Sequence, residues 1–135
     1  QKENLRTIGM IFIKLILAHL LGDFILQPNS WVADKENRKL KSSYLYFHVL
    51  IHTVLSFIFL WDFKLWWVAV LVGISHFIID VCKLSFQKIQ TKKRWFFIDQ
   101  ALHVAVIGGI SLYFGEFNFE FLNSKINPES LILLA

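Results

Sequence analysis

Residues 18–27 read AHLLGDFILQ, an apolar stretch that carries His19 and Asp23 four residues apart. On an α-helix, side chains at this spacing lie on the same face, one turn above each other. An ionisable side chain inside a membrane is costly unless it is paired or functional. The stretch therefore predicts a membrane-spanning helix whose polar face has a paired or functional role.

Four apolar runs dominate the chain, at about 8–27, 44–61, 65–84 and 96–115, and each is near the length that crosses a bilayer. The composition agrees, because 56% of the 135 residues are hydrophobic and only 18% are charged. Four runs cannot close a β-barrel, so the backbone polar groups must be satisfied within helices. We predict an all-α, polytopic membrane helix bundle with four transmembrane helices, formed by residues 1–135 as a single domain. The tryptophans support these boundaries, since all of them fall at predicted span ends, where indole rings prefer the headgroup region: Trp31, Trp61, Trp66, Trp67 and Trp95.

The basic residues predict how the bundle is oriented. The loops after the first and third runs are rich in Lys and Arg, whereas the loop after the second run, residues 62–64, is short. The positive-inside rule places both basic loops in the cytoplasm and both termini outside. The sequence pI near 9.3 then reflects membrane orientation. Nucleic-acid binding is not expected, because the basic residues lie in loops next to the membrane.

Two shorter segments carry further expectations. The polar stretch after Pro28 predicts a short interfacial helix with Ser30 as its N-cap. The last five residues, LILLA (131–135), read as the beginning of another apolar run. We expect the sequence to be a fragment in which a further helix is cut short.

The pair in the first span has counterparts in the other three. The second run opens with His48 and His52, the third ends with His76 and Asp80, and the fourth begins with Asp99 and His103. Every histidine in the chain thus has a His or Asp partner four residues away. Because the four helices alternate in direction, all four pairs are expected in the cytoplasmic half of the bundle, within roughly 4–14 Å of its inner boundary.

A single polar pair in a membrane helix is often an interhelical contact rather than a ligand site. Four pairs at one level favour metal binding, since imidazole nitrogen and carboxylate oxygen are the mixed ligands of zinc, manganese or non-haem iron. Eight ligands exceed one tetrahedral site, so we predict two divalent cations, zinc first, with Asp23, Asp80 and Asp99 as the catalytic carboxylates. The complete set of predicted metal ligands is His19, Asp23, His48, His52, His76, Asp80, Asp99 and His103.

Three polar residues next to the pairs are predicted to bind substrate. Gln27 follows Asp23 by four residues, Lys83 follows Asp80 by three, and Gln100 adjoins Asp99. Lys83 can contact a phosphate. The loop residues Lys35, Lys93 and Arg94 lie on the same side, where snorkelling and anchoring at the membrane surface are the favoured interpretation.

Five motifs carry a resemblance to a known family: HLLGDFILQP at 19–28, WVADK at 31–35, HxxxH at 48–52, HFIIDxxK at 76–83 and FxxDQxxH at 96–103. Together they resemble the bacterial membrane proteins grouped as domain of unknown function 3307. The resemblance implies a multi-pass protein of the bacterial plasma membrane, and it implies no established activity. A looser similarity, limited to His and Asp pairs near span ends, links the pattern to membrane-bound metal-dependent hydrolases of the phospholipase C type.

The favoured function is a membrane-embedded metal-dependent hydrolase that acts on a lipid-linked phosphoester from the cytoplasmic side. Divalent metal or proton transport is the first alternative, although the outer halves of the spans carry almost no polar residues. Haem ligation by facing histidines is a second alternative. A metal-stabilised structural or regulatory membrane protein is a third, and the oligomeric state stays open.

Overall fold

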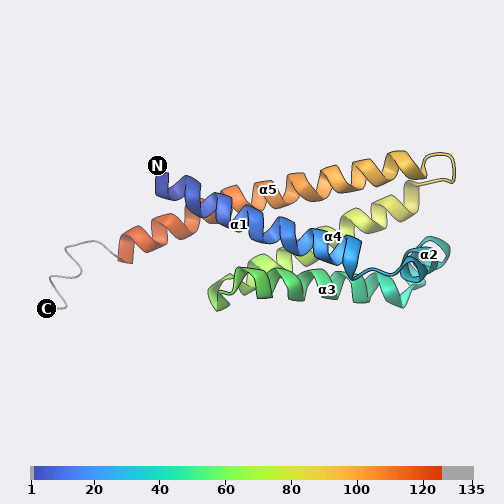
Figure 1. Ribbon diagram of the computed structural model, residues 1–135, viewed down its shortest axis with the longest axis horizontal. Coiled ribbons are helices and arrows are strands. Elements are labelled where there is room, and N and C mark those ends of the chain that lie inside the picture. The colour runs from blue at the N-terminus through green and yellow to red at the C-terminus, as the bar shows by residue number, and fades with distance from the viewer. Residues whose placement is uncertain (1, 126–135) are drawn as a thin grey trace, which may run out of the picture.

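A computed structural model describes residues 2–125 of the chain, and side chains are described as far as residue 115. The described part consists of helices joined by short turns, with no strand (Figure 1). A π-helical turn, Leu21–Ile25, directly continues the first helix. The α-helices in order are α1 (Lys2–Leu20), α2 (Asn29–Arg38), α3 (Ser43–Leu60), α4 (Trp66–Phe86) and α5 (Lys92–Lys125). Short 3-10 turns, Lys39–Lys41 and Phe63–Leu65, precede α3 and α4.

Four of the helices form an antiparallel bundle. Helix α1 packs on α3 and α5, and α4 also packs on α3 and α5, so the four helices close a ring. Figure 1 shows α1 beginning and α5 ending at the same end of the bundle, while α2 and the turn between α4 and α5 lie at the other. The expected all-α bundle, with both basic loops on one side, is therefore confirmed.

The bundle contains four helical segments long and apolar enough to cross a membrane: Lys2–Ile25, Ser43–Leu60, Phe63–Phe86 and Lys92–Gly115. They overlap the four predicted runs, although the first begins six residues earlier than the expected start at 8. Large apolar side chains such as Ile13, Leu50 and Leu112 are more than half exposed on the outside of the bundle. Such a surface suits lipid rather than water.

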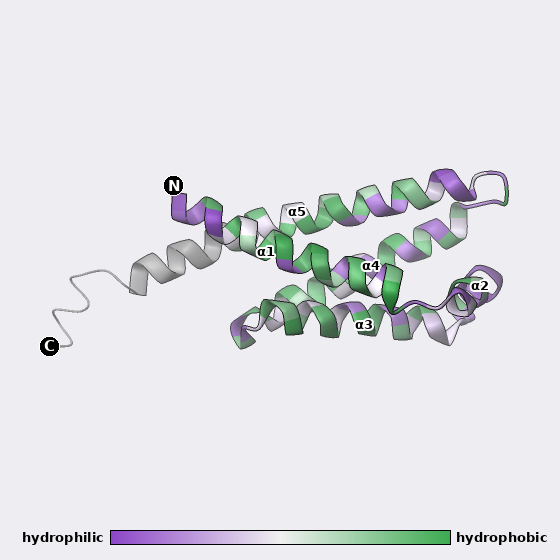
Figure 2. Ribbon diagram, viewed as in Figure 1, coloured by the Kyte–Doolittle hydropathy of each residue, from purple (hydrophilic) through white to green (hydrophobic). Residues whose placement is uncertain are grey.

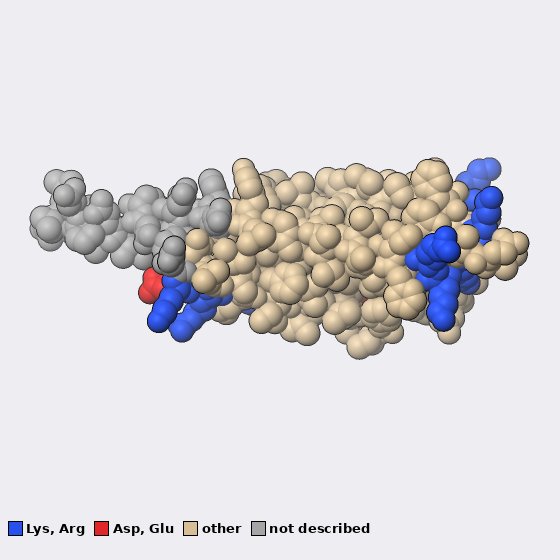
Figure 3. Space-filling model, turned by 90° about the horizontal axis from the view of Figure 1, so that it is seen from above, with Lys and Arg blue, Asp and Glu red and all other residues tan. Residues whose placement is uncertain are grey.

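The distribution of charge also fits helices that cross a membrane. Apolar residues are the commonest in α1, α3, α4 and the coloured part of α5, whereas α2 is largely polar (Figure 2). The Lys and Arg side chains gather at the two ends of the molecule, with the surface between them free of a comparable cluster on the face shown (Figure 3). Basic side chains at both ends of an apolar belt are typical of helices anchored at two membrane surfaces.

The buried interior of the bundle changes character along its length. At the end where α1 begins, it is a cluster of hydrocarbon side chains, which we call the apolar half: Ile11, Leu15, Leu60, Leu65, Val68, Val72, Ile107 and Phe114. At the other end the buried residues include histidines and aspartates, which we call the polar half. The two halves are built by the same four helices.

The segment after Pro28 forms the predicted short helix, but Ser30 does not cap it. Helix α2 begins at Asn29, and Pro28 occupies the N-cap position with extended backbone and no side-chain cap. Proline is compatible with this position, because its fixed φ, here −63°, suits extended backbone and it has no backbone N–H to leave unsatisfied. The predicted further helix at LILLA lies outside the described residues.

Candidate metal centre

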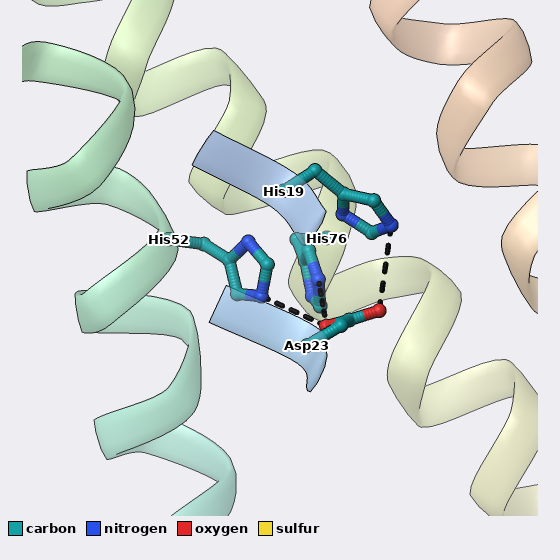
Figure 4. A group of neighbouring side chains, drawn as sticks. All are labelled: His19, Asp23, His52 and His76. Atoms are coloured by element: carbon teal, nitrogen blue, oxygen red, sulfur yellow. Dashed lines mark hydrogen bonds and ion pairs between the residues drawn. The ribbon is translucent and has the colours of Figure 1, made fainter. Parts of the chain in front are cut away.

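Asp23 lies at the middle of the polar half. Its Oδ1 atom is 2.9 Å from His52 Nε2, 3.1 Å from His48 Nε2 and 3.3 Å from His76 Nε2. Its Oδ2 atom is 3.4 Å from His19 Nε2. Figure 4 shows three of these imidazoles, from α1, α3 and α4, pointing at the one carboxylate. The carboxylate thus joins three helices through a single side chain.

The π-helical turn explains how Asp23 reaches this place. Leu26 N donates to Leu21 O at 2.9 Å, five residues earlier, so the turn is wider than an α-helical one. Gly22, inside it, is buried, and a Cβ atom there would lie 2.6 Å from His52 Cε1. The glycine therefore leaves the space that the His52 ring fills beside Asp23. Single π-turns of this kind are frequent at functional sites.

Asp80 and Asp99 extend the cluster toward α5. Asp80 Oδ1 lies 3.6 Å from His76 Nδ1 and 3.5 Å from His103 Nε2. Asp99 Oδ1 lies 3.3 Å from the same His103 Nε2. His48 Nε2, which contacts Asp23, is also 3.7 Å from Asp80 Oδ2. The contacts therefore run continuously from one carboxylate to the next.

All eight predicted ligands meet in this cluster. They form three overlapping groups whose ligand atoms lie within 4.8 Å of one another. His76 belongs to the first and second groups and Asp80 to the second and third, so neighbouring sites share ligands. The groups are His19, Asp23, His52 and His76; then His48, His76 and Asp80; then Asp80, Asp99 and His103.

The cluster is shielded from solvent and is short of hydrogen bonds. The five histidines are 1–3% exposed, and the Asp23 side chain is 8% exposed. His76 Nε2, His103 Nε2, Asp80 Oδ2 and Asp99 Oδ1 have no hydrogen-bond partner within the described part of the chain, although each lies near an oppositely polar group. Buried polar atoms without hydrogen bonds are costly. Cations between them would satisfy nitrogen and oxygen lone pairs together, so this donor set fits a divalent metal.

Gln100 holds two of the carboxylates in position. Its Nε2 atom donates to Asp23 Oδ2 at 2.9 Å and to Asp99 Oδ2 at 3.1 Å. Its Oε1 atom is 3.2 Å from His19 Nε2 and can accept a hydrogen bond from it. The amide that we expected to bind substrate is therefore engaged with the cluster itself. Such contacts orient ligands and tune their affinity.

The other two predicted substrate-binding residues lie at the rim of the cluster. Lys83 Nζ is 3.7 Å from Asp99 Oδ2, and the Lys83 side chain is 24% exposed. Gln27 Nε2 donates to the Asp23 backbone oxygen at 3.3 Å, while Gln27 Oε1 is buried without a hydrogen bond inside the described part of the chain. Both side chains border the cavity described below.

Lys35 is the residue that sequence reasoning underestimated. It is only 6% exposed, and its Nζ atom lies 3.6 Å from Asp80 Oδ2. Helix α2 delivers it inward, anchored by the stacking of Trp31 on Tyr44 with ring centroids 5.0 Å apart. The spacing of Trp31 and Lys35, four residues apart on one face of a short helix, was the signal that could have found it.

A cavity leads from the cluster to the end of the bundle that carries α2. Next to the cluster it has a volume of about 50 Å³ and touches all three carboxylates and His48. It continues into a wider space of about 220 Å³ between the π-helical turn, α2, α4 and α5. Both parts are lined by Lys35, Lys83 and Gln27. The cluster is therefore open on one side, and two ammonium groups stand at the opening.

Comparisons with known proteins agree with the motifs. Neither the curated proteins nor the solved structures contain a match to the chain. A family model described as "Protein of unknown function (DUF3307)" matches residues 11–130, which include every residue of the cluster. The chain belongs to the DUF3307 family of proteins of unknown function.

Proposed function

We propose that this protein is a membrane-embedded, metal-dependent hydrolase of the bacterial plasma membrane. It would bind two divalent cations, with zinc as the favoured metal. It would cleave a lipid-linked phosphoester at the end of the bundle that carries the basic loops, which we assign to the cytoplasm. The observation that carries the proposal is a cluster of five imidazoles and three carboxylates that opens into a cavity flanked by two lysines.

The donor set supports two cations better than one. Eight ligand atoms in three groups with shared members exceed the four that a tetrahedral ion needs. Two cations about 3.5–4 Å apart supply the nucleophilic water and the positive charge that phosphoester hydrolysis requires. Their positive charge would also offset the three carboxylates, which among the described side chains face only Lys35 and Lys83 as permanent cations within ion-pair range.

The side chains of the protein would orient the metal ligands and the substrate and would transfer protons. Asp23 contacts four histidines and so would hold several metal ligands in place. Asp99 contacts only His103 among the histidines, and its Oδ1 atom has no hydrogen bond within the described residues. A carboxylate that is less committed to metal can serve as general base, so Asp99 is our choice for that role. The ammonium groups of Lys35 and Lys83 would hold the phosphate.

The same geometry argues against transport. The cavity reaches the cluster from one end of the bundle, whereas the other end is closed by the apolar half, where Leu15, Val68 and Ile107 are at most 3% exposed. A transport path needs polar side chains or water on both sides of the membrane. Chemistry on a substrate that approaches from one side needs an opening on that side alone.

Metal analysis tests the first part of the proposal. The protein, purified in detergent and loaded with zinc, is expected to retain about two ions per chain by elemental analysis. His76→Ala and Asp80→Ala should each lose bound metal while keeping their helical circular dichroism, because each residue belongs to two of the three ligand groups. The matched control is Ser56→Ala, which removes a buried polar group from α3 outside the cluster and should leave the metal content unchanged. A wild-type protein that retains no metal, or variants that retain all of it, would contradict the proposal.

Activity is tested on the same preparations. Metal-loaded wild-type protein should hydrolyse a phosphate ester of a long-chain alcohol, releasing the alcohol and phosphate, and removal of metal by a chelator should abolish the activity until zinc, manganese or iron is restored. Zinc uptake into proteoliposomes without any hydrolysis would instead identify a transporter. Tightly bound metal without either activity would identify a structural role.

A further inference from the structure

Two phenylalanine rings separate the cavity from the lipid-facing surface of the bundle. Phe24 belongs to the π-helical turn and Phe96 to α5, and their rings meet edge to face with centroids 6.3 Å apart. Both rings line the inner and outer parts of the cavity. Both are also open to the outside, since Phe24 is 55% and Phe96 38% exposed. The wall at this point is therefore only one layer of side chains thick.

Phe24 also lines an apolar groove on the outer surface. The groove has a volume of about 430 Å³ and almost no polar lining; it is formed by Leu17, Leu20, Leu21, Phe24, Ile25 and Phe59. All of these residues lie within candidate membrane spans, so the groove faces the hydrocarbon region of a bilayer. One side of Phe24 thus borders a polar cavity, and the other borders a site suited to a hydrocarbon chain.

The charge next to the rings fits an anionic headgroup. Lys83 Nζ lies 5.8 Å from the centroid of the Phe96 ring. A group that passed between the two rings would enter the inner part of the cavity, which Lys83, Lys35 and the three carboxylates line together. Phosphate is the headgroup chemistry that both lysines and divalent cations favour.

We infer that the ligand of this centre is an amphiphile with a phosphate headgroup and a single long hydrocarbon chain, and that it reaches the centre sideways from the bilayer. Its headgroup passes between Phe24 and Phe96, and its chain stays in the groove along α1. This inference rests on the proposed function, because it assumes a phosphate-binding metal centre. To the proposed function it adds the route by which the ligand enters and the residues that bind the ligand's hydrocarbon chain.

The chain-binding groove is tested with two phosphate probes that share a headgroup, hexadecyl phosphate and ethyl phosphate. Binding to zinc-loaded protein is measured by titration calorimetry in an uncharged detergent. Leu20→Gln places a polar group in the groove. Leu50→Gln is the matched control, since it changes another exposed leucine, on α3, that does not line the groove. We expect Leu20→Gln to weaken hexadecyl phosphate binding about 10-fold and to leave ethyl phosphate binding unchanged. Leu50→Gln should affect neither probe.

The lateral route is tested by closing it. In a Cys82→Ser background, Phe24→Cys and Phe96→Cys are joined with a short reducible bifunctional thiol reagent, since Cys82 is the single cysteine of the chain. The bridge should slow association of hexadecyl phosphate at least about 10-fold, because a headgroup can no longer pass, and reduction should restore the rate. Ethyl phosphate, which can approach from the aqueous end, should bind at the same rate with and without the bridge.

The outcomes separate this inference from the proposed function. Loss of metal binding in the wild-type protein would overturn both. Normal metal and ethyl phosphate binding, with hexadecyl phosphate unaffected by Leu20→Gln or by the bridge, would overturn the lateral route alone and identify a water-soluble phosphate as the ligand. Metal content, measured on every variant, shows whether the variant has kept the folded centre.

Discussion

The two halves of the bundle solve the problem of burial in opposite ways. In the apolar half, side chains such as Leu15 and Val68 fill the space between four helices with hydrocarbon. In the polar half, one or two turns away on the same helices, the space is filled by imidazoles and carboxylates. In a membrane, hydrocarbon packing holds helices together through van der Waals contacts, whereas buried charges are costly until they are paired. The apolar half therefore maintains the fold, and the polar half uses that stability to hold ligands.

This division predicts that the two halves respond differently to mutation. Changes in the polar half should remove metal and activity with modest effects on folding. Changes in the apolar half should reduce stability and leave the metal content of the folded protein unchanged. A variant that breaks this pattern would show that the halves are coupled more tightly than their contacts indicate.

The largest effect is expected at Asp23, the carboxylate with the most histidine contacts. Asp23→Asn keeps the size of the side chain and removes its negative charge, so metal content and activity should fall by more than about 100-fold, beyond the loss typical of residues that only support a ligand. Elemental analysis and a hydrolysis assay measure the two quantities. Asp62→Asn is the control, because Asp62 caps the turn before α4 at the opposite end of the bundle. Full metal content in Asp23→Asn would remove Asp23 from the ligand set.

In the apolar half the largest effect is expected at Leu15, which is completely buried. Leu15→Ala should lower the free energy of unfolding by about 2–5 kcal/mol, because a cavity replaces side-chain contacts. Denaturant titration in detergent measures this change, and metal per folded chain should equal that of the wild type. Ile13→Ala, at a position that is 58% exposed to lipid, is the control and should cost much less. If Leu15→Ala also empties the metal centre, the two halves are not independent.

Gly22 offers a smaller and more selective change in the polar half. Gly22→Ala would place a Cβ atom 2.7 Å from His52 Nε2, so the ring must move away from Asp23. We expect metal affinity to fall about 10–100-fold, as it does when a ligand is misoriented. Gly9→Ala is a matched control on the same helical segment, because its Cβ atom would have nothing within 4 Å. Equal metal affinity in both variants would show that the His52 ring has room to adjust.

Gly22 also marks the limit of what the sequence could predict. The four spans were predictable because each is a long apolar run, and the meeting of the four polar pairs followed from their common depth. The π-helical turn was not predictable, because the four-residue spacing of His19 and Asp23 is equally consistent with a regular α-helix. The wider turn depends on tertiary contacts, above all on the space that His52 occupies.

The burial of Lys35 was hard to predict for a related reason. A lysine in a basic loop next to a membrane usually extends to the surface, and its four-residue spacing from Trp31 is a weak signal by comparison. Its burial depends on how α2 folds back over the bundle, which is set by the contact of Trp31 with Tyr44 and by the hydrogen bond from Ser42 to Asp34. Such contacts between separate elements carry little signal in a single sequence.

The smallest effect on stability and metal content is expected for a polar residue that lies in the apolar half. Ser111 is 1% exposed on α5, yet its hydroxyl donates only to the Ile107 backbone oxygen of its own helix, at 2.7 Å. Ser111→Ala should therefore change the free energy of unfolding by less than about 1 kcal/mol, because the carbonyl keeps its helical hydrogen bond. Denaturant titration and elemental analysis, run beside His103→Ala on the same helix, compare the two positions directly. If Ser111→Ala lost metal as His103→Ala is expected to, burial of a polar group would no longer distinguish a ligand from a packing residue, and the division between the halves would have to be redrawn.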